Sequence, residues 1–397
     1  MKASKAFLFV FLIVFSLCLV TTQHTQSQSP GTIYIRSDGS VDPDTAPIQI
    51  DGNIYTFTDN INIDSGDCGI EVDRDNIVID GAGFTLQGTA AYISRGIDLS
   101  GRSNVTIKNM EIRNFMDGIY LVASSNNTIT GNYITANTDS GIWTSGVSNT
   151  ITGNYIANNE IGILFEVSHD LVYHNNFVNN TKQVADICWT NPWLPSSATI
   201  LDDGYPSGGN YWSDYNGTDL YSSPHQNITG SDGIGDHPYI IDENNQDNCP
   251  LMGMFYDFTV EIELGQIYHL RVISNSTVSN LEVRVWLTSA NEYLQPGDEF
   301  IYYVVDGEEG SVGFCRIMIP RVVLNDSYVV LVDWHEVSAT ELPFSNSTHA
   351  YLYFTYNHST NEVVIVPEFP SWTPILLLLI VLTVAVAIYK RRLLQKR

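Results

Sequence analysis

The residues best suited to chemistry lie in an acidic, glycine-rich stretch in the middle of the chain. Between Gln183 and Leu270 the sequence has thirteen Asp or Glu residues and no Lys or Arg. Ca²⁺ is bound by about six to eight oxygen atoms, so carboxylates on a flexible, glycine-kinked loop are candidate ligands. Their spacing matches neither an EF-hand nor a Ca²⁺-binding nonapeptide repeat, and side-chain capping of turns is the structural alternative. The predicted calcium ligands are Asp232, Asp236, Asp242 and Asp247.

A cluster of aromatic residues begins just before this stretch and continues into it. Indole and phenol rings combine an apolar face with a polar edge, so a row of them could stack against sugar rings. The structural alternative is that the rings seal the end of a hydrophobic core. The candidate carbohydrate-binding residues are Trp189, Trp193, Tyr211, Trp212 and Tyr215.

Four of the five cysteines lie beyond the N-terminal apolar segment, at Cys68, Cys188, Cys249 and Cys315. Disulfides persist in proteins outside the cell, so one or two bridges are plausible. We expect Cys188 to pair with Cys249 and to staple the acidic stretch, although the sequence alone does not choose among the pairings.

Two kinds of polysaccharide-cleaving site are conceivable. Inverting hydrolysis uses one carboxyl group as an acid and another as a base, and Asp139, Asp202 and Asp203 could supply them. A lyase needs basic residues beside the carboxylate of a uronate. An acidic protein surface would repel such a polyanionic substrate. Since Asp139 also suits a turn, the sequence favours no catalytic site. The candidate lyase residues are Arg102, Lys108 and Arg113.

The charge balance narrows the class of partner. The chain has 397 residues, 18 Lys+Arg and 44 Asp+Glu, and a formal net charge of -26. A nucleic-acid binder needs a basic face, so nucleic acid is excluded as a partner. Hydrophobic residues make up 44% of the chain, which is enough to build a core and argues against a disordered acidic protein.

Apolar residues recur about every 22 residues in the first half of the chain. Glycine–isoleucine pairs begin at Gly96, Gly118, Gly141 and Gly162, and two more apolar tracks run in parallel with them. The segments between are short, alternating and β-branched, which is typical of strands. This period predicts stacked coils of three short strands each, a parallel β-helix. The two other tracks are Ile107, Ile129, Ile151 and Val172, and Ile112, Ile134, Ile156 and Phe177.

Asparagine is expected to form the corners between these strands. Asn tolerates the left-handed conformation that a sharp corner requires, and stacked amides can hydrogen-bond from coil to coil. A row of exposed amides could instead bind sugar. The rows that share a coil position are Asn132, Asn154 and Asn175, and Asn137, Asn159 and Asn180.

Several segments carry a family resemblance. They are Arg74-Asp75-Asn76-Ile77-Val78-Ile79-Asp80-Gly81-Ala82-Gly83, Gly96-Ile97-Asp98-Leu99 and Ser124-Ser125-Asn126-Asn127-Thr128-Ile129-Thr130-Gly131-Asn132. By these residues the chain resembles the NosD-type right-handed β-helix family, within the carbohydrate-binding and sugar-hydrolase β-helix superfamily. Two later stretches, 208–215 and 230–236, are similar to those of archaeal surface proteins of this type. The resemblance covers roughly 31–252 and implies the fold, but such helices serve as enzymes, binders and spacers.

The resemblance also raises two chemical possibilities. NosD proteins are associated with copper-site maturation, and copper prefers imidazole or sulfur ligands. The pairs His169/His174 and His225/His237 lack ligand spacing and a nearby Met cluster. Asn137-Thr138-Asp139 and Asp202-Asp203-Gly204 are similar to polygalacturonase elements, but the companion Gly-His-Gly and Arg-Ile-Lys elements are missing.

The periodicity disappears after the acidic stretch. Alternating segments such as 259–264 and 281–286 are bounded by Gly, Asn and Pro turns. Short strands at this spacing predict an antiparallel β-sandwich over 255–366.

Both ends of the chain carry membrane signals. Lys2 and Lys5 precede an apolar run that is typical of a secretory signal peptide, expected over 1–28. Near the C-terminus, 372–389 is apolar and long enough for a transmembrane helix, and the basic tail that follows places the body outside the cell. The preceding Pro367-Glu368-Phe369-Pro370 resembles the PEF sorting motif of archaeal surface proteins, which implies an archaeosortase as a processing partner.

The sequence therefore predicts an all-β, exported, membrane-anchored cell-surface protein. A right-handed β-helix with its N-terminal cap is expected over 29–200, an acidic segment over 201–254, the sandwich next, and the sorting motif, membrane helix and tail over 367–397. The expected role is to bind extracellular glycans or to build the envelope. A carbohydrate-active enzyme and a metal-handling accessory protein for calcium or copper remain alternatives.

Overall fold

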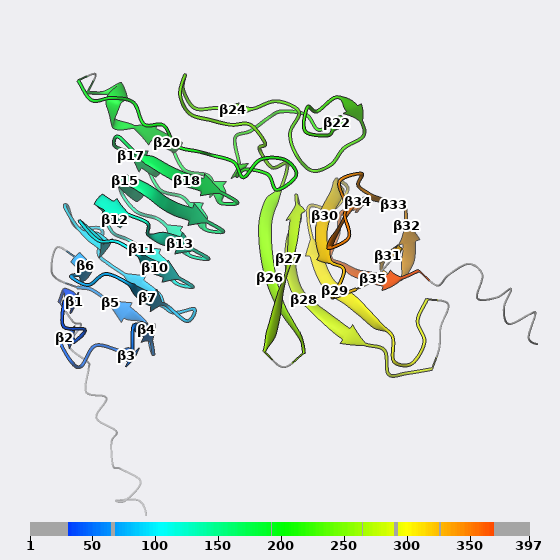
Figure 1. The fold of residues 1–397 in the computed structure, drawn as a ribbon, viewed down its shortest axis with the longest axis horizontal. Helices are drawn as coiled ribbons and strands as arrows, with labels where there is room; N and C mark the ends of the chain where they lie inside the picture. The colour runs from blue at the N-terminus through cyan, green and yellow to red at the C-terminus, as the bar shows by residue number, and fades with distance from the viewer. Residues whose placement is uncertain are drawn as a thin grey trace, which may run out of the picture.

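The computed structural model describes residues 31–64, 68–191, 193–263, 265–289, 293–324 and 327–368. Its elements are β-strands and one short 3₁₀ turn, Ile187–Trp189, so the all-β prediction is confirmed for this part of the chain. The predicted signal peptide and membrane helix lie outside the described residues. Within those residues no helix is long and apolar enough to cross a membrane. Figure 1 shows a stack of coils beside a second body of longer strands.

The stack of coils is a parallel β-helix with three columns of strands, as the 22-residue period predicts (Figure 1). The first column is β1 (Ile33–Ile35), β6 (Cys68–Val72), β9 (Arg95–Asp98), β12 (Asp117–Ser125), β15 (Ser140–Thr152), β17 (Ile161–Phe165) and β20 (Lys182–Asp186). The second is β4 (Ile54–Phe57), β7 (Ile77–Asp80), β10 (Val105–Lys108), β13 (Thr128–Thr130), the end of β15, and β18 (His169–Tyr173). The third is β5 (Ile61–Asn62), β8 (Thr85–Gln87), β11 (Glu111–Arg113), β14 (Tyr133–Thr135), β16 (Tyr155–Ala157), β19 (Asn176–Val178) and β21 (Tyr211–Trp212).

The first coil is protected by two antiparallel pairings. β2 (Val41–Asp42) pairs with β1, and β3 (Ile48–Asp51) pairs with β4. A parallel sheet that ended openly would present unpaired backbone groups to other chains. These short hairpins cover that edge at the N-terminal end of the β-helix.

The predicted apolar tracks line the interior in register. Ile129 pairs with both Ile107 and Ile151, and all three side chains are fully buried. In the Gly–Ile pairs of the first column the residue before the isoleucine must be glycine, because the backbone of the next coil lies too close for a Cβ atom. A Cβ at Gly118 would lie 2.5 Å from the carbonyl oxygen of Gly141, and the same clash recurs between Gly141 and Gly162 at 2.7 Å. The Gly–Ile repeat is therefore set by the spacing of the coils.

The asparagine rows form hydrogen-bonded ladders, as predicted. The backbone N–H of Asn132 donates to Oδ1 of Asn154 at 3.0 Å, and that of Asn154 donates to Asn175 at 3.1 Å. The Asn154 amide donates onward to Asn175 Oδ1 at 2.9 Å and back to the Ile129 carbonyl at 2.8 Å. The row 137–159–180 repeats this pattern, and a third row runs through 127 and 149. The corner amides along these rows are thus hydrogen-bonded from coil to coil.

The left-handed conformation belongs to the residue before each ladder asparagine. At 158 and 179 that residue is itself an asparagine, so the prediction holds for asparagine corners but not for the ladder positions. Gly131, Gly153 and His174 have φ values of 64°, 68° and 58°, and each precedes a ladder position. These residues turn the corner, and the asparagine that follows directs its amide into the coil stack. The two tasks that the sequence assigned to one residue are divided between neighbours.

Two of the ladders end on buried carboxylates. The row through Asn149 ends on Asp170, which accepts its backbone N–H at 2.9 Å. The row through Asn175 continues to Asn210, whose backbone N–H donates to Oδ2 of Asp247 at 2.7 Å. Asp247 is fully buried although it comes from the acidic segment beyond the last full coil. The acidic segment therefore supplies the acceptor that terminates a ladder.

The acidic segment also forms two small hairpins, and Figure 1 shows β24 nearer to the β-helix and β22 nearer to the second body. Their strands are β22 (Tyr221–Ser222), β23 (Ile228–Thr229), β24 (Tyr239–Ile240) and β25 (Gln246–Asp247). Most of the remaining backbone in this segment forms turns.

Two five-stranded antiparallel sheets follow. One sheet is β26 (Met254–Glu263), β27 (Gln266–Ser274), β30 (Val312–Pro320), β34 (His349–Asn357) and β33 (Ala339–Glu341). The other is β28 (Thr277–Val285), β29 (Glu299–Asp306), β35 (Asn361–Pro367), β31 (Tyr328–Val332) and β32 (His335–Val337). Buried residues of both sheets, such as Ile317 and Ile365, share one core, which gives the predicted sandwich.

Replacing a central ladder residue should be costly. In Asn154→Ala the buried N–H of Asn132 loses its acceptor and the Oδ1 of Asn175 loses one of its two donors, so we expect a loss of roughly 2–4 kcal/mol in the free energy of unfolding. Urea denaturation measures it. The matched control is Asn216→Ala, an exposed asparagine outside the ladders, which should change stability by less than about 0.5 kcal/mol. Equal stability of the two variants would contradict the ladder account.

The carboxyl that terminates the second ladder should make stability depend on pH. Burial raises the pKa of Asp247 to about 7, against the hydrogen bonds from Asn210, Trp212 and Cys249. Because the folded pKa exceeds the unfolded one, stability is greatest below about pH 4 and falls as pH rises toward 7, by at most about 1.4 kcal/mol per pH unit per carboxyl. In Asp247→Asn the urea-measured decrease should shrink, while Asp51→Asn on exposed β3 should retain it. An unchanged slope in Asp247→Asn would rule out this carboxyl as the source.

Candidate functional site

The four predicted calcium ligands are used separately as hydrogen-bond acceptors, and Asp247 is the one that ends a ladder. Asp232 accepts from the Tyr205 hydroxyl at 2.9 Å and from the backbone of Ile234 at 3.0 Å. Asp236 accepts from the backbone of 220 and 221, and Asp242 from that of 244 and 245. Across the described chain, no group of three or more His, Cys, Asp or Glu residues is placed to hold a metal ion. The structure gives calcium no support, and turn capping accounts for these carboxylates.

A fifth carboxylate in the same region, that of Asp219, also has a raised pKa. Asp219 accepts from the backbone N–H groups of Asp232 at 3.0 Å and Gly233 at 2.8 Å. Burial raises its pKa to about 7, although these hydrogen bonds favour the charged form. The loop at 230–236 is therefore held in place by hydrogen bonds to carboxylates of the same segment.

The five predicted sugar-binding aromatics do not form one platform. Trp212 is only 1% exposed and lies flat between Phe177 and Tyr239, with ring centroids 4.3 and 4.4 Å away. Its indole N–H donates to Asp247 at 2.9 Å, so Trp212 seals the core. Tyr215 is half-buried, and its hydroxyl donates to the carbonyl of residue 237 at 2.6 Å.

The remaining aromatic candidates lie apart from that stack. Trp189 follows the first column and donates to Asp242 at 3.3 Å. Trp193 is 93% exposed. Tyr211 continues the third column on β21. Local clustering in the sequence thus mixed core residues with surface residues.

All four described cysteines are free thiols in the structure. Cys68 and Cys315 are buried, while Cys188 and Cys249 are half-buried. Burial raises the pKa of the Cys249 thiol to about 12, helped by the nearby carboxylates. The structure does not join Cys188 to Cys249.

The candidate hydrolase carboxylates belong to different parts of the coil. Asp139 precedes β15 at the corner between the third and first columns. Asp202 and Asp203 follow the second column, where Asp202 accepts from Asn248 at 3.0 Å and Asp203 from Ser207 at 2.7 Å. Burial raises the pKa of Asp139, and the neighbouring Glu160 raises it further. This raised pKa gives Asp139 the environment of a candidate acid.

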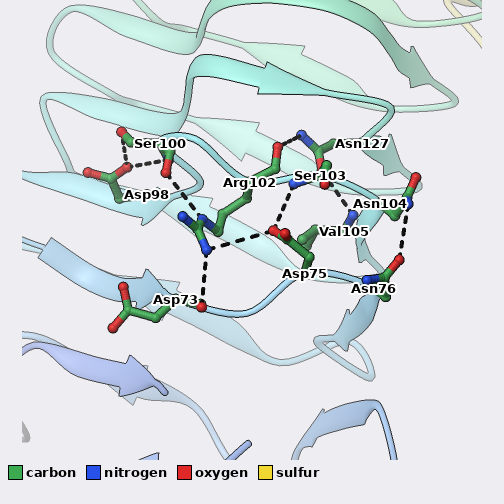
Figure 2. Close-up of polar contacts among 10 residues, drawn as sticks. All are labelled: Asp73, Asp75, Asn76, Asp98, Ser100, Arg102, Ser103, Asn104, Val105 and Asn127. Atoms are coloured by element: carbon green, nitrogen blue, oxygen red, sulfur yellow. Dashed lines mark hydrogen bonds and ion pairs between the residues drawn. The ribbon is translucent and has the colours of Figure 1, made fainter. Parts of the chain in front are cut away.

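The candidate lyase residues are held by carboxylates of the β-helix. Figure 2 shows Arg102 reaching back to the preceding coil, where Nη1 lies 3.1 Å from the Asp73 carbonyl oxygen and 3.8 Å from Asp75 Oδ1. Lys108 pairs with Asp80 at 3.1 Å, again one coil back. Arg113 lies 3.6 Å from Glu111 on its own strand. These cations therefore neutralise structural carboxylates.

The best-formed aromatic surface lies on the third column and was missed in the sequence. Tyr133 and Tyr155 occupy the same outward position on β14 and β16, and their rings stack at 4.2 Å with an interplanar angle of 14°. Tyr133 is 50% exposed. Burial raises the pKa of its phenol to about 12, so the hydroxyl stays neutral and can donate. The signal that could have found them is the 22-residue spacing of two tyrosines at an outward-facing position.

The opposite wall of this surface comes from the sandwich. On β26, Tyr256 and Phe258 stack with ring centroids 6.2 Å apart and planes 13° from parallel. They and the two tyrosines of the third column line a groove of about 360 Å³. A second hollow of about 570 Å³ shares Tyr133 and continues along the third column toward Glu111. The two hollows share Gly131 and Tyr133, so they adjoin on the surface of the β-helix.

Two contacts hold the groove walls together. The Asn176 side chain accepts from the backbone N–H of Phe255 at 2.7 Å and donates to its carbonyl at 2.8 Å. The Phe255 ring also stacks on His174 at 4.1 Å. Burial lowers the pKa of His174 to about 4, so this imidazole is neutral at ordinary pH. The start of β26 is thus anchored to the β-helix where the groove closes.

Comparison with solved structures finds phage tailspikes at low similarity. Dettilon tailspike protein (gp208) is 11% identical, with a TM-score of 0.26, and the match covers 78% of this chain and 74% of that chain. The full-length tailspike protein 2 from Escherichia coli O157:H7 bacteriophage CAB120 is 12% identical, with a TM-score of 0.27, and the match covers 78% and 51%. Scores of this size carry no functional argument. No curated protein matches the chain.

Residues 20–217 match the model of the family described as periplasmic copper-binding protein (NosD). Copper would require converging imidazole or sulfur ligands. His174 is buried against Phe255 and its Nε2 faces the carbonyl of Ser207 at 3.0 Å, so it is not available as a ligand. The described residues form no cluster that fits the metal. The sequence match and the three columns of parallel strands together support a NosD-like parallel β-helix in this part of the chain.

Proposed function

We propose that the protein is an exported, membrane-anchored cell-surface protein that binds glycans in the groove between the third column and β26. The single observation that carries this proposal is the facing pair of aromatic stacks, Tyr133/Tyr155 and Tyr256/Phe258, around one groove of about 360 Å³. Clefts lined by aromatic rings with a few polar groups are typical ligand sites. Sugar rings present apolar C–H faces, which stack on such rings.

The groove supports a chain-like ligand over a compact one. Its second hollow follows the third column past Gly131 and Asn109 to Gly83, where small residues leave the surface open. Thr85 and Glu111 continue the outward position of Tyr133 on earlier coils and are hydrogen-bonded to each other at 2.8 Å. An extended glycan lying across the coils would meet rings at one end and hydroxyl or carboxylate groups at the other.

The charge of the groove favours neutral or aminated glycans. The charged residues that line its two hollows are Glu111 and Asp257, and both are acidic. With a chain net charge of -26, a uronate-rich polymer would be repelled both locally and at long range.

The sequence of the two ends supports the location. The N-terminal apolar segment after Lys2 and Lys5 fits export, and 372–389 followed by basic residues fits a C-terminal anchor. The motif at 367–370 fits processing by an archaeosortase-type enzyme. Nine Asn-x-Ser/Thr sequons fit an extracellular, glycosylatable chain.

Glycan-array binding of the full chain tests the proposal. Tyr133→Ala should weaken binding of a neutral glycan at least about tenfold, which corresponds to ~1.4 kcal/mol. The reason is that the substitution removes one of the aromatic rings that line the groove. The matched control is Trp193→Ala, which removes a more exposed aromatic away from the groove and should leave affinity unchanged. Loss of binding in the Trp193 variant alone would move the site to the aromatic cluster of the acidic segment.

A carbohydrate hydrolase is the second candidate, and one observation favours it. The raised pKa of Asp139 suits a general acid. Tyr120 and Trp143 lie on the adjoining first column with centroids 5.3 Å apart and could seat a sugar. Release of reducing ends from neutral polysaccharides by the wild type, abolished in Asp139→Asn but retained in Asp203→Asn, would establish this activity and displace the binding-only function.

A further inference from the structure

The most unusual charge in the molecule is the Arg316 guanidinium, which lies between the sandwich and the acidic segment. Arg316 comes from β30 and is only 2% exposed. Nη2 of its guanidinium donates to the carbonyl of Pro206. The central carbon, Cζ, lies 5.2 Å from the centroid of the Phe344 ring and 5.5 Å from that of the Tyr351 ring. Among the described residues no carboxylate lies within ion-pair distance of it.

The other end of the guanidinium has no partner. Nη1 of Arg316 is buried and makes no hydrogen bond. Arg316 lines a cavity of about 30 Å³, and so does Arg271 from the neighbouring strand β27. Nε of Arg271 is also buried without a hydrogen bond, although it lies 3.4 Å from Asp257 Oδ2. Two guanidinium groups with unused N–H donors therefore line one small cavity.

The charges around the cavity leave it electropositive. Asp232 attracts Arg316 from beyond ion-pair distance and accepts the Tyr205 hydroxyl; burial raises the pKa of this carboxyl, and Arg316 lowers it. Asp257 is shared with His269, which lies 2.8 Å from it. The imidazole of His174, also in the cavity wall, is neutral. A buried cation without a close partner is strongly unfavourable, so an occupant that accepts hydrogen bonds is required.

We propose that this cavity binds one small inorganic monovalent anion of the size of chloride. A water molecule needs about 10–15 Å³ of such space, so the cavity has room for a halide but not for a sulfate or a sugar acid. The anion accepts from Arg316 Nη1 and Arg271 Nε and supplies the negative charge that no carboxylate of the described residues places within ion-pair distance of Arg316. The site is independent of the glycan groove, with which it shares only Phe255 in its lining.

The position of the anion gives it a structural consequence. The cavity wall combines Ser207 and His174 from the β-helix end with Arg271 and Arg316 from the sandwich. An anion there binds across the junction of the two bodies and stabilises their contact. Because it binds only the folded, docked state, its concentration raises the apparent stability.

The test compares sodium chloride and sodium bromide with sodium gluconate at equal ionic strength, using thermal unfolding of the full chain. We expect Tm to be about 3 °C or more higher in the halides. The increment should vanish in Arg316→Met and persist in Arg284→Met, which removes an arginine from the exposed face of β28. Equal Tm values for the wild type in halide and gluconate would overturn the proposal and assign the cavity to water.

A second measurement does not depend on the folding of any variant. Crystals of the wild type grown in bromide should show an anomalous peak between Arg316 and Arg271. A peak there supports the proposal, and an ordered cavity without anomalous signal contradicts it.

Discussion

The structure depends on satisfying the backbone amides at the buried corners of the coils. Each corner exposes an N–H toward the interior, and a fully buried amide without a partner is strongly unfavourable. The asparagine ladders solve this by having each coil supply the acceptor for the coil before it, as Asn154 does for Asn132 and Asn175 does for Asn154. A ladder of this kind always requires one more acceptor at its end. The row through Asn149 finds this acceptor within the β-helix, in Asp170, whereas the row through Asn175 takes it from the acidic segment beyond the repeat.

The acidic segment supplies the acceptor for the ladder that runs through Asn175 and Asn210. Asp247 accepts from Asn210 at the end of one ladder and, through the Trp212 indole, fixes the ring that covers the open core. The same segment carries Tyr205 and Asp232, which are hydrogen-bonded to each other, and Pro206, which accepts from Arg316 of the sandwich. The cap on the β-helix is thus also the docking surface for the second body. Its acidity reflects carboxylates used as internal acceptors. The groove lined by Tyr133, Tyr155, Tyr256 and Phe258 exists because this docking brings β26 against the third column.

The sequence predicted what is periodic and local. The Gly–Ile pairs, the apolar tracks and the asparagine rows all follow from one coil being repeated at a fixed spacing, and the structure confirms them. The sequence did not predict contacts between segments that are distant along the chain. The Asn176–Phe255 clamp joins residues 79 apart in the chain, and neither residue has a distinguishing pattern. Clusters of aromatic or acidic residues were misleading for the same reason, because Trp212 and Asp247 are partners in the core while Trp193 is on the surface.

The central claim is that ligand binds where the third column meets β26. Hydrogen–deuterium exchange of the full chain, with and without a glycan that it binds, tests this most directly. The account predicts that the glycan slows exchange in 131–133, 153–155 and 254–258 and leaves 187–195 unchanged. Slower exchange confined to 187–195, or to the outward face of the first column around 120 and 143, would contradict it.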